Sequence, residues 1–261
     1  LKTKETKSNI NGFATYSSGN HGQGMAWSSR LAGFPCTVIV PKTASAAKKN
    51  AILGYGAELV ECGPKVSDRY DTCDKVRLEK GLEVIPPFDH PDVIAGQGTI
   101  GLELLEQVPD LDAVLVPVSG GGMSSGLCVT IKAIKPDVKI FLVTPKGKRL
   151  GECLKTGKRP WEGPPQYLDT IADGLRIQPT GYITTPILIK YAEKEVFEVS
   201  DEDIVDGMKF VFERLKLVVE PSSATTVAAA FSEQFKSLDP SIRNVALILS
   251  GGNVELDKLP W

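Results

Sequence analysis

Three short segments combine glycine with small polar residues, a composition that suits anion binding through backbone amides. They are Ser-Ser-Gly-Asn-His-Gly-Gln at residues 17–23, Ser-Gly-Gly-Gly-Met at residues 119–123 and Leu-Ser-Gly-Gly-Asn at residues 249–253. Each lies at the end of an apolar run that is typical of a β-strand. Because open α/β sheets bind ligands beyond the carboxyl ends of their strands, these segments are the first candidates for a site.

The segment at residues 17–23 precedes an expected helix, whose first backbone N–H groups have no partner inside the helix. Ser17, Asn20 and His21 add side-chain donors, so the loop suits a carboxylate or another small anion. Serine and asparagine also cap helices in the absence of any ligand. A cap needs one such residue, whereas this segment has seven consecutive small or polar residues, including one of only two histidines. We therefore favour a binding site.

Three consecutive glycines, Gly120 to Gly122, let backbone amides approach a phosphate without interference from a Cβ atom. The alternative is a tight turn with close helix–strand packing. No Gly-Lys-Ser/Thr follows, and Ser125 stands where a dinucleotide fingerprint requires glycine. We favour phosphate binding. The Ser-Gly-Gly run at residues 250–252 is common in turns and gains weight only as a third polar strand end.

Apolar runs alternate with helical patterns, which predicts βαβ units and mostly parallel sheets flanked by helices. Strands are expected over residues 12–16, 36–40, 58–61, 82–85, 113–118, 139–143 and 245–249. Helices are expected over residues 20–32, 44–53, 67–80, 91–107, 123–134, 201–215 and 222–235. Residues 146–181 are rich in glycine and proline, which predicts an irregular loop with one short helix.

The proline-rich segment at residues 86–91 predicts a crossing between two lobes. We expect a smaller, substrate-side lobe over residues 11–89 and a larger, cofactor-binding lobe formed by residues 1–10 and 90–261. The chain starts at Leu1 with a polar, lysine-rich segment. From this we expect a fragment or a processed chain that lacks the N-terminal part of the larger lobe.

The composition is that of an ordinary globular protein: 261 residues, 42% hydrophobic, 24% charged and a net charge of −2. There is no basic excess for nucleic acid, no apolar run long enough to span a membrane and no visible signal peptide. The five cysteines form no Cys-x-x-Cys pair, which argues against a structural zinc site. Scattered single cysteines suit a reducing compartment, so we expect a cytoplasmic protein.

The motifs together resemble one family of enzymes. SSGNHGQ, PPFDHPDVIAGQGT, VPVSGGGM, TIADG, EPSSA and LSGGN occur in the order and at the intervals of the serine racemase and serine/threonine dehydratase family. These are fold-type-II pyridoxal-phosphate enzymes with a tryptophan synthase β-like, two-lobed α/β fold. The match covers nearly the whole chain. Each motif alone is moderately specific, but the ordered set is highly specific.

The resemblance implies a cofactor, pyridoxal 5′-phosphate, and a role for each matching residue. The glycine-rich loop would bind its phosphate, Asn20 its pyridine hydroxyl and Ser250 its pyridine nitrogen, with Gly174 nearby. The implied residues of the phosphate loop are Ser119, Gly120, Gly121, Gly122 and Met123. The loop from Ser17 to His21, with Asn20, would hold the substrate carboxylate.

Ser18 is the implied catalytic residue, because racemase-type members use this serine as an acid/base on the face opposite the cofactor lysine. Many dehydratases have alanine there, so Ser18 favours racemisation, whereas Phe88 resembles dehydratases. The implied function is serine racemase or L-serine/L-threonine dehydratase (ammonia-lyase). The implied substrate is a small amino acid, serine or threonine, and the implied assembly is a homodimer.

Two departures from the family pattern stand out. The Schiff-base lysine lies in a Ser-Phe-Lys-x-Arg-Gly motif upstream of SSGN, and the sequence contains no such segment. We therefore expect this chain alone to be inactive. Serine racemases also have glutamate, which helps to bind a divalent cation, where this chain has Thr144. Threonine supplies no carboxylate, so we expect no metal ligand here and doubt the cation.

Two alternatives remain beside an incomplete, otherwise active enzyme. A lysine-lacking, non-catalytic paralogue would bind a phosphate-bearing ligand or a complete subunit. A nucleotide-binding α/β protein is disfavoured by the two failed fingerprints.

Overall fold

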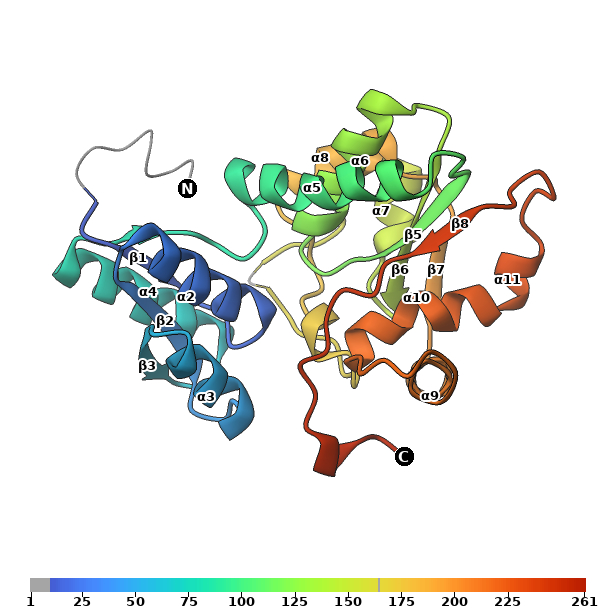
Figure 1. Ribbon diagram of the computed structural model, residues 1–261. Coiled ribbons are helices and arrows are strands. Elements are labelled where there is room, and N and C mark those ends of the chain that lie inside the picture. Colours follow the sequence, from blue (N-terminus) through green and yellow to red (C-terminus); the bar gives the residue numbers. More distant parts are fainter. Residues whose placement is uncertain (1–9, 164) are drawn as a thin grey trace. The chain divides into compact units, whose positions relative to one another are not determined.

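The computed structural model describes residues 10–163 and 165–261 (Figure 1). The chain forms two compact units, of which the first ends at Val93 and the second begins at Ile94. The sequence pattern placed this boundary at residues 89 and 90. The expected assignment of residues 1–9 to the larger lobe lies outside the described residues. Each unit contains its own four-stranded parallel sheet with flanking helices, which confirms the predicted fold class.

The sheet of the first unit has the strand order β3-β2-β1-β4. Its strands are β1 (Phe13–Thr15), β2 (Cys36–Pro41), β3 (Glu58–Cys62) and β4 (Glu83–Val84). The helices between them are α2 (Asn20–Ala32), α3 (Ala46–Gly54) and α4 (Val66–Lys80). Parallel neighbours require crossover connections, and these helices supply them.

Strand β2 shows how the sequence builds this core, because all its residues are buried. Val38 and Val40 pack with Ile52 in one cluster, whereas Ile39 packs with Ala14 in another. Successive side chains of a strand point to opposite faces, so an uninterrupted apolar run serves helices on both sides.

The sheet of the second unit has the order β7-β6-β5-β8. Its strands are β5 (Ala113–Pro117), β6 (Lys139–Pro145), β7 (Val196–Val199) and β8 (Val245–Leu247). Its helical segments are α5 (Pro91–Gln107), which starts before the boundary, α6 (Gly122–Ile134), α7 (Leu150–Thr156), α8 (Thr184–Tyr191), α9 (Asp201–Phe210), α10 (Pro221–Phe231) and α11 (Glu233–Lys236). Shorter turns are a 3₁₀ turn at Asp173–Leu175, a π-helical turn at Val211–Leu215 and a 3₁₀ turn at Leu256–Lys258.

Two apolar clusters cover the two faces of this sheet. Val114 and Val116 of β5 pack toward α5, α6, α7 and α8, and Ala113 and Leu115 pack toward α9 and α10. Figure 1 shows α5, α6 and α8 on one side of the sheet and α10 on the other. The second unit is thus a three-layer α/β arrangement.

Most predicted elements are confirmed to within a few residues, and the differences have local causes. The helix expected over 222–235 is interrupted at Ser232, whose backbone is extended and whose side chain caps α11. The helix expected over 201–215 changes to π-helical geometry at Val211. Helix α8 and strand β7 were not predicted. Strand β7 is only four residues long and carries an exposed glutamate, so its apolar signal is weak.

All five cysteines are free and buried. Burial raises the pKa of the Cys73 thiol to about 11 and that of Cys128 to about 12.

In the described part of the chain, every helix is too short or too polar to cross a membrane.

Candidate active site

The loop between β1 and α2 carries Ser17, Ser18 and Gly19. Gly19 occupies the N-cap position of α2, and no side chain caps this helix. The two serine hydroxyls and the amides of residues 17–19 have no hydrogen-bond partner among the described residues. Both serines are half-buried. Ordinary helix capping therefore does not explain this segment, and its donors are available to an anion.

Gly22 lets this loop pack closely against the first turn of α2. A Cβ atom at Gly22 would lie 2.0 Å from the carbonyl oxygen of Ser17. A side chain at this position would displace the backbone of the loop, since no rotation can relieve a clash at Cβ. The second glycine of the SSGNHGQ motif is thus needed for loop shape.

His21 is held by Ile85, the residue that follows β4, which is paired with β1 in the sheet of the first unit. Its Nε2 lies 3.1 Å from the carbonyl oxygen of Ile85, which also accepts a 2.7 Å hydrogen bond from the hydroxyl of Thr15. A carbonyl oxygen only accepts, so this bond places the proton on Nε2 and leaves Nδ1 as an acceptor. Burial lowers the pKa of His21 to about 4, despite an opposing contribution from the Ile85 bond. The ring is therefore neutral near pH 7, and a bound carboxylate would depend on amides and hydroxyls for its partners.

Residues 119–123 connect β5 to α6 and form the second candidate segment. Gly121 has φ +96, and a Cβ atom there would lie 2.9 Å from Oγ1 of Thr184. The carbonyl oxygen of Gly120 accepts hydrogen bonds from Oγ1 of Thr184 at 2.6 Å and from the amide of Gly181 at 3.0 Å. The amides of Gly120, Gly121 and Gly122 donate to no described residue. The loop is thus fixed through its carbonyl side, and its amides are available to a phosphate at the start of α6.

Ser250 and Gly174 lie in two loops that are both tied to the start of α10. The amide of Glu220, the N-cap residue of α10, donates to the carbonyl oxygen of Gly251 at 3.0 Å. The amide of Gly174 donates to Oγ of Ser222 at 2.9 Å. The buried carboxylate of Glu220 accepts a 3.2 Å bond from the amide of Asn253. Glu220 and Ser222 belong to the EPSSA motif of the family resemblance, from which this connecting role was not predicted.

The parallel sheet of the second unit brings several of these segments to one edge. Strands β5, β6 and β8 are neighbours and run in the same direction, so the phosphate-loop candidates, Thr144 and Ser250 lie at their carboxyl ends. Ser17, Ser18, Asn20 and His21 lie together after β1 in the first unit. Each group thus occupies the strand end at which α/β proteins bind ligands.

Comparison with known proteins identifies the family. Residues 1–251 match the family described as "Pyridoxal-phosphate dependent enzyme". The chain belongs to this family.

Three relatives show which kinds of enzyme in this family the chain is similar to. A crystal structure of a pyridoxal 5′-phosphate-dependent aspartate racemase is 51% identical, with a TM-score of 0.97, and the match covers 100% of this chain and 79% of the other. Serine racemase of Mus musculus is 41% identical over 95% of this chain and 72% of its own length. The beta-hydroxyaspartate dehydratase of Paracoccus denitrificans (strain Pd 1222) is 39% identical over 96% of this chain and 77% of its own length. Racemases and dehydratases both occur among these relatives.

The residues of the second unit fit pyridoxal phosphate. Three consecutive glycines at a helix start present amides that have no partner in residues 10–163 and 165–261, which suits the phosphate group. Ser250 supplies a neutral hydroxyl at the neighbouring strand end. In the first unit, Asn20, the implied partner of the pyridine hydroxyl, is exposed at the first position of α2. The roles of the individual residues remain predictions from the resemblance.

The donors at the end of β6 do not fit a divalent cation. Thr144 is buried, and its Oγ1 has no hydrogen-bond partner among the described residues. No group of three histidine, cysteine or acidic residues that could hold a metal occurs in residues 10–163 and 165–261. Calcium and magnesium require several oxygen ligands, usually with carboxylates among them.

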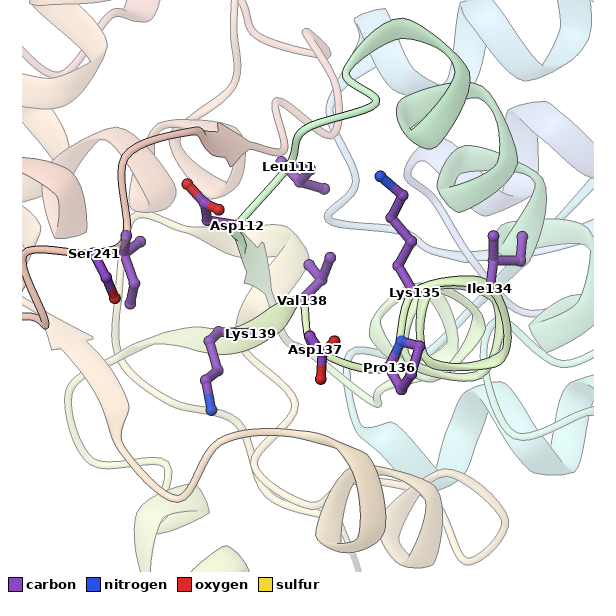
Figure 2. A pocket seen from close by; sticks show the side chains of 10 residues that line it. Leu111, Asp112, Ile134, Lys135, Pro136, Asp137, Val138, Lys139 and Ser241 are labelled. Carbon is purple, nitrogen blue, oxygen red and sulfur yellow. The ribbon is translucent and has the colours of Figure 1, made fainter.

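A surface hollow lies at the opposite, amino edge of the second sheet (Figure 2). Its lining includes Asp112, Lys135, Lys139 and Ser241. The carboxylate of Asp112 is engaged by the backbone amides of Arg243 and Asn244 at 2.9 Å and 2.8 Å. None of the predicted site residues lines this hollow.

Proposed function

We propose that this protein is a pyridoxal-phosphate-dependent racemase of small polar α-amino acids, with β-elimination as a side reaction. The observation that carries the proposal is the half-buried Ser18 hydroxyl, which has no hydrogen-bond partner among the described residues and lies in a loop of unpaired amides. An acid/base group beside an anion-binding loop is what racemisation requires of the protein.

Pyridoxal phosphate, when bound, supplies an electron sink that makes the α-proton of an attached amino acid acidic. The amides of Gly120 to Gly122 would hold its phosphate. By the family resemblance, Ser250 would offer a neutral hydroxyl to the pyridine nitrogen, Asn20 would bind the pyridine hydroxyl, and Gly174 would lie near the cofactor. The hydrogen bond from the Gly174 amide to Ser222 keeps the Gly174 loop in position.

The substrate carboxylate binds the loop that contains Ser17 and His21. Because His21 is neutral near pH 7, the attraction comes from the helix N-terminus and from uncharged donors. Ser18 then acts as the acid/base that exchanges a proton with the substrate α-carbon on one of its two faces. Its hydroxyl gives up a proton to that carbon in one direction of racemisation and recovers one in the other.

The opposite face requires a base, which in the resembling family is the lysine of Ser-Phe-Lys-x-Arg-Gly. The sequence printed here has no such segment. We therefore expect the 261-residue chain alone to form no pyruvate from serine. The lysine would serve both as the nucleophile that binds the cofactor covalently and as the base, and each role requires a positioned side chain. Pyruvate formed by this chain alone would contradict that expectation and would point to another lysine.

Serine and threonine are the substrates that the motifs imply, and aspartate is a second candidate. The aspartate candidate rests on the 51% identical aspartate racemase and on the dehydratase named for beta-hydroxyaspartate. A dicarboxylate differs from serine by a negative charge, so its binding requires a further cationic or donor group.

The deciding assay uses the protein expressed from its complete coding sequence with pyridoxal phosphate. L-serine, L-threonine, L-aspartate and their D-enantiomers are supplied separately. Chiral chromatography measures racemisation, and keto-acid release measures elimination. Formation of the opposite enantiomer supports the proposal. Keto acid without any racemisation makes the protein a dehydratase. Pyridoxal phosphate binding without turnover of any substrate favours the non-catalytic relative.

We further propose a cytoplasmic homodimer. The compartment is supported by five free cysteines, which persist in a reducing environment. The dimer is supported by the family resemblance alone. Light scattering after size-exclusion chromatography measures the assembly, and fractionation of cells measures the location.

A further inference from the structure

Lys148 is completely buried, and no step of the proposed reaction uses it. It follows the end of β6 and lies between Gly147 and Arg149, which are exposed. Its ammonium group donates a hydrogen bond to the carbonyl oxygen of Ile177. Its own carbonyl oxygen accepts a 3.0 Å bond from Nε1 of Trp161. Lys148 is therefore held at both its backbone and its side-chain end.

The charge of Lys148 has no acidic partner within the described part of the chain. Burial alone lowers its pKa, to about 7, so the ammonium form predominates below pH 7 and is shared with the neutral amine near pH 7. A buried, unpaired ammonium opposes folding, so such a group calls for a compensating role. The ammonium has three donors, and Ile177 is the one described acceptor that it reaches.

The segment that Lys148 holds is part of the candidate site. Ile177 pairs with Tyr167 in an isolated antiparallel bridge, and the amide of Leu168 donates to the carbonyl oxygen of Arg176 at 2.7 Å. Gly174 lies between these paired residues and donates its amide to Ser222. The hydrogen bond from the Lys148 ammonium to Ile177 thus holds the paired ends of the loop that carries Gly174.

The same strand end is where the family resemblance implies a divalent cation. Thr144 replaces the glutamate expected there, and its buried Oγ1 has no partner among residues 10–163 and 165–261. Lys148 follows Thr144 by four positions. The absence of a metal carboxylate and the presence of a buried ammonium thus occur in one short segment. Each makes the segment more positive, so together they can offset the absence of a divalent cation.

We propose that the Lys148 ammonium is an internal cation that takes over the loop-fixing role of a divalent cation, so that this protein binds no divalent cation at the end of β6. A fixed ammonium needs no carboxylate ligands, which is consistent with threonine at position 144. The proposal concerns the ion requirement and does not depend on the racemase activity.

The first test measures ion binding by the protein expressed from its complete coding sequence, with pyridoxal phosphate bound. The protein is dialysed against EDTA and then exposed separately to magnesium, calcium or manganese. Metal content is measured by mass spectrometry and thermal stability by melting. We expect substoichiometric metal and the same Tm in every solution. A stoichiometric divalent cation, or a Tm that rises by several degrees with one of them, would overturn the proposal, because ligands that bind the native state raise Tm.

The second test measures the loop directly by hydrogen exchange. Lys148→Met removes the charge but keeps a long side chain, and Lys155→Met is the control because Lys155 is exposed on α7. We expect faster exchange of amides in residues 166–178 in Lys148→Met alone. Equal exchange in wild type and Lys148→Met would show that the ammonium does not fix the loop. If Lys148→Met does not fold, the ion-binding test still decides the proposal.

Discussion

At the residue scale, our proposal of racemisation rather than elimination rests on Ser18. Ser18 does not cap α2, because the N-cap residue is Gly19. Its hydroxyl is therefore not used for helix capping. Elimination requires proton removal at one face, whereas racemisation requires an acid/base at both. A serine at this position therefore has a specific use in a racemase.

Ser18→Ala should reduce racemisation by about 10²–10⁴-fold, the range for loss of a general acid/base, and should spare elimination. Ser28→Ala is the control, since Ser28 is exposed on α2, the helix that follows Ser18. Chiral chromatography and keto-acid assays on the same samples give both rates. Equal losses of both activities in Ser18→Ala would assign Ser18 to substrate binding.

His21 should make stability depend on pH in a narrow acidic window. Its pKa is about 4 in the folded protein, compared with an ordinary value of 6.5 for an exposed histidine, because burial disfavours the charged ring. Between these values the unfolded chain binds more protons, so the free energy of unfolding rises with pH and becomes level above the window. Urea unfolding at several pH values should show a smaller slope in His21→Gln than in wild type. A slope that the substitution leaves unchanged would contradict this assignment.

At the element scale, the connection from β5 to α6 depends on backbone geometry that only glycine accepts easily. Gly121 combines a positive φ with close contact to Thr184, so both the torsion and the space exclude a side chain. The carbonyl oxygen of Gly120 accepts a hydrogen bond from Thr184 of α8, whereas the amides of Gly120, Gly121 and Gly122 have no partner among the described residues.

Gly121→Ala should weaken pyridoxal phosphate binding by at least about 10-fold and lower stability by about 1–3 kcal/mol, because it strains the loop that we propose to bind the phosphate. Gly96→Ala is the control. A Cβ atom at Gly96 in α5 meets no heavy atom within 4 Å, so alanine should be neutral or stabilising. Absorbance titration with the cofactor and urea unfolding measure the two effects. Wild-type affinity in Gly121→Ala would place the phosphate elsewhere.

The sequence allowed prediction of those elements whose signals are local. The Gly120–Gly122 run and the apolar strands β2 and β5 have compositions that admit few alternatives. Lys148 and Glu220 could not be predicted, because their burial depends on distant segments. Lys148 stands in a Lys-Gly-Lys-Arg run that resembles solvent-exposed loop, and only the packing of Trp161 and the Ile177 segment reveals its burial.

At the scale of the whole molecule, two sheets with separate cores imply two stability units. Ile39 is fully buried in the first unit, and Leu115 is fully buried in the second. Each belongs to a cluster formed within its own unit. A cavity in one core need not weaken the other.

Ile39→Ala and Leu115→Ala should each cost about 2–5 kcal/mol within the unit that contains the substitution. Hydrogen exchange resolved by peptide should show faster exchange in β1, β2 and β3 for Ile39→Ala, and in β5, β6 and β8 for Leu115→Ala. Each variant serves as the control for the other. Faster exchange throughout the chain in both variants would mean that the units open as one.

The buried thiols offer a way to follow these openings in the unmodified protein. Cys36, Cys62 and Cys73 belong to the first unit, and Cys128 and Cys153 belong to the second. Burial raises the pKa of every one of them, so little thiolate exists in the closed state. An alkylating reagent therefore reacts when a unit opens, and peptide mapping identifies which unit has opened. The alkylation rates of the native cysteines therefore report how often each unit opens.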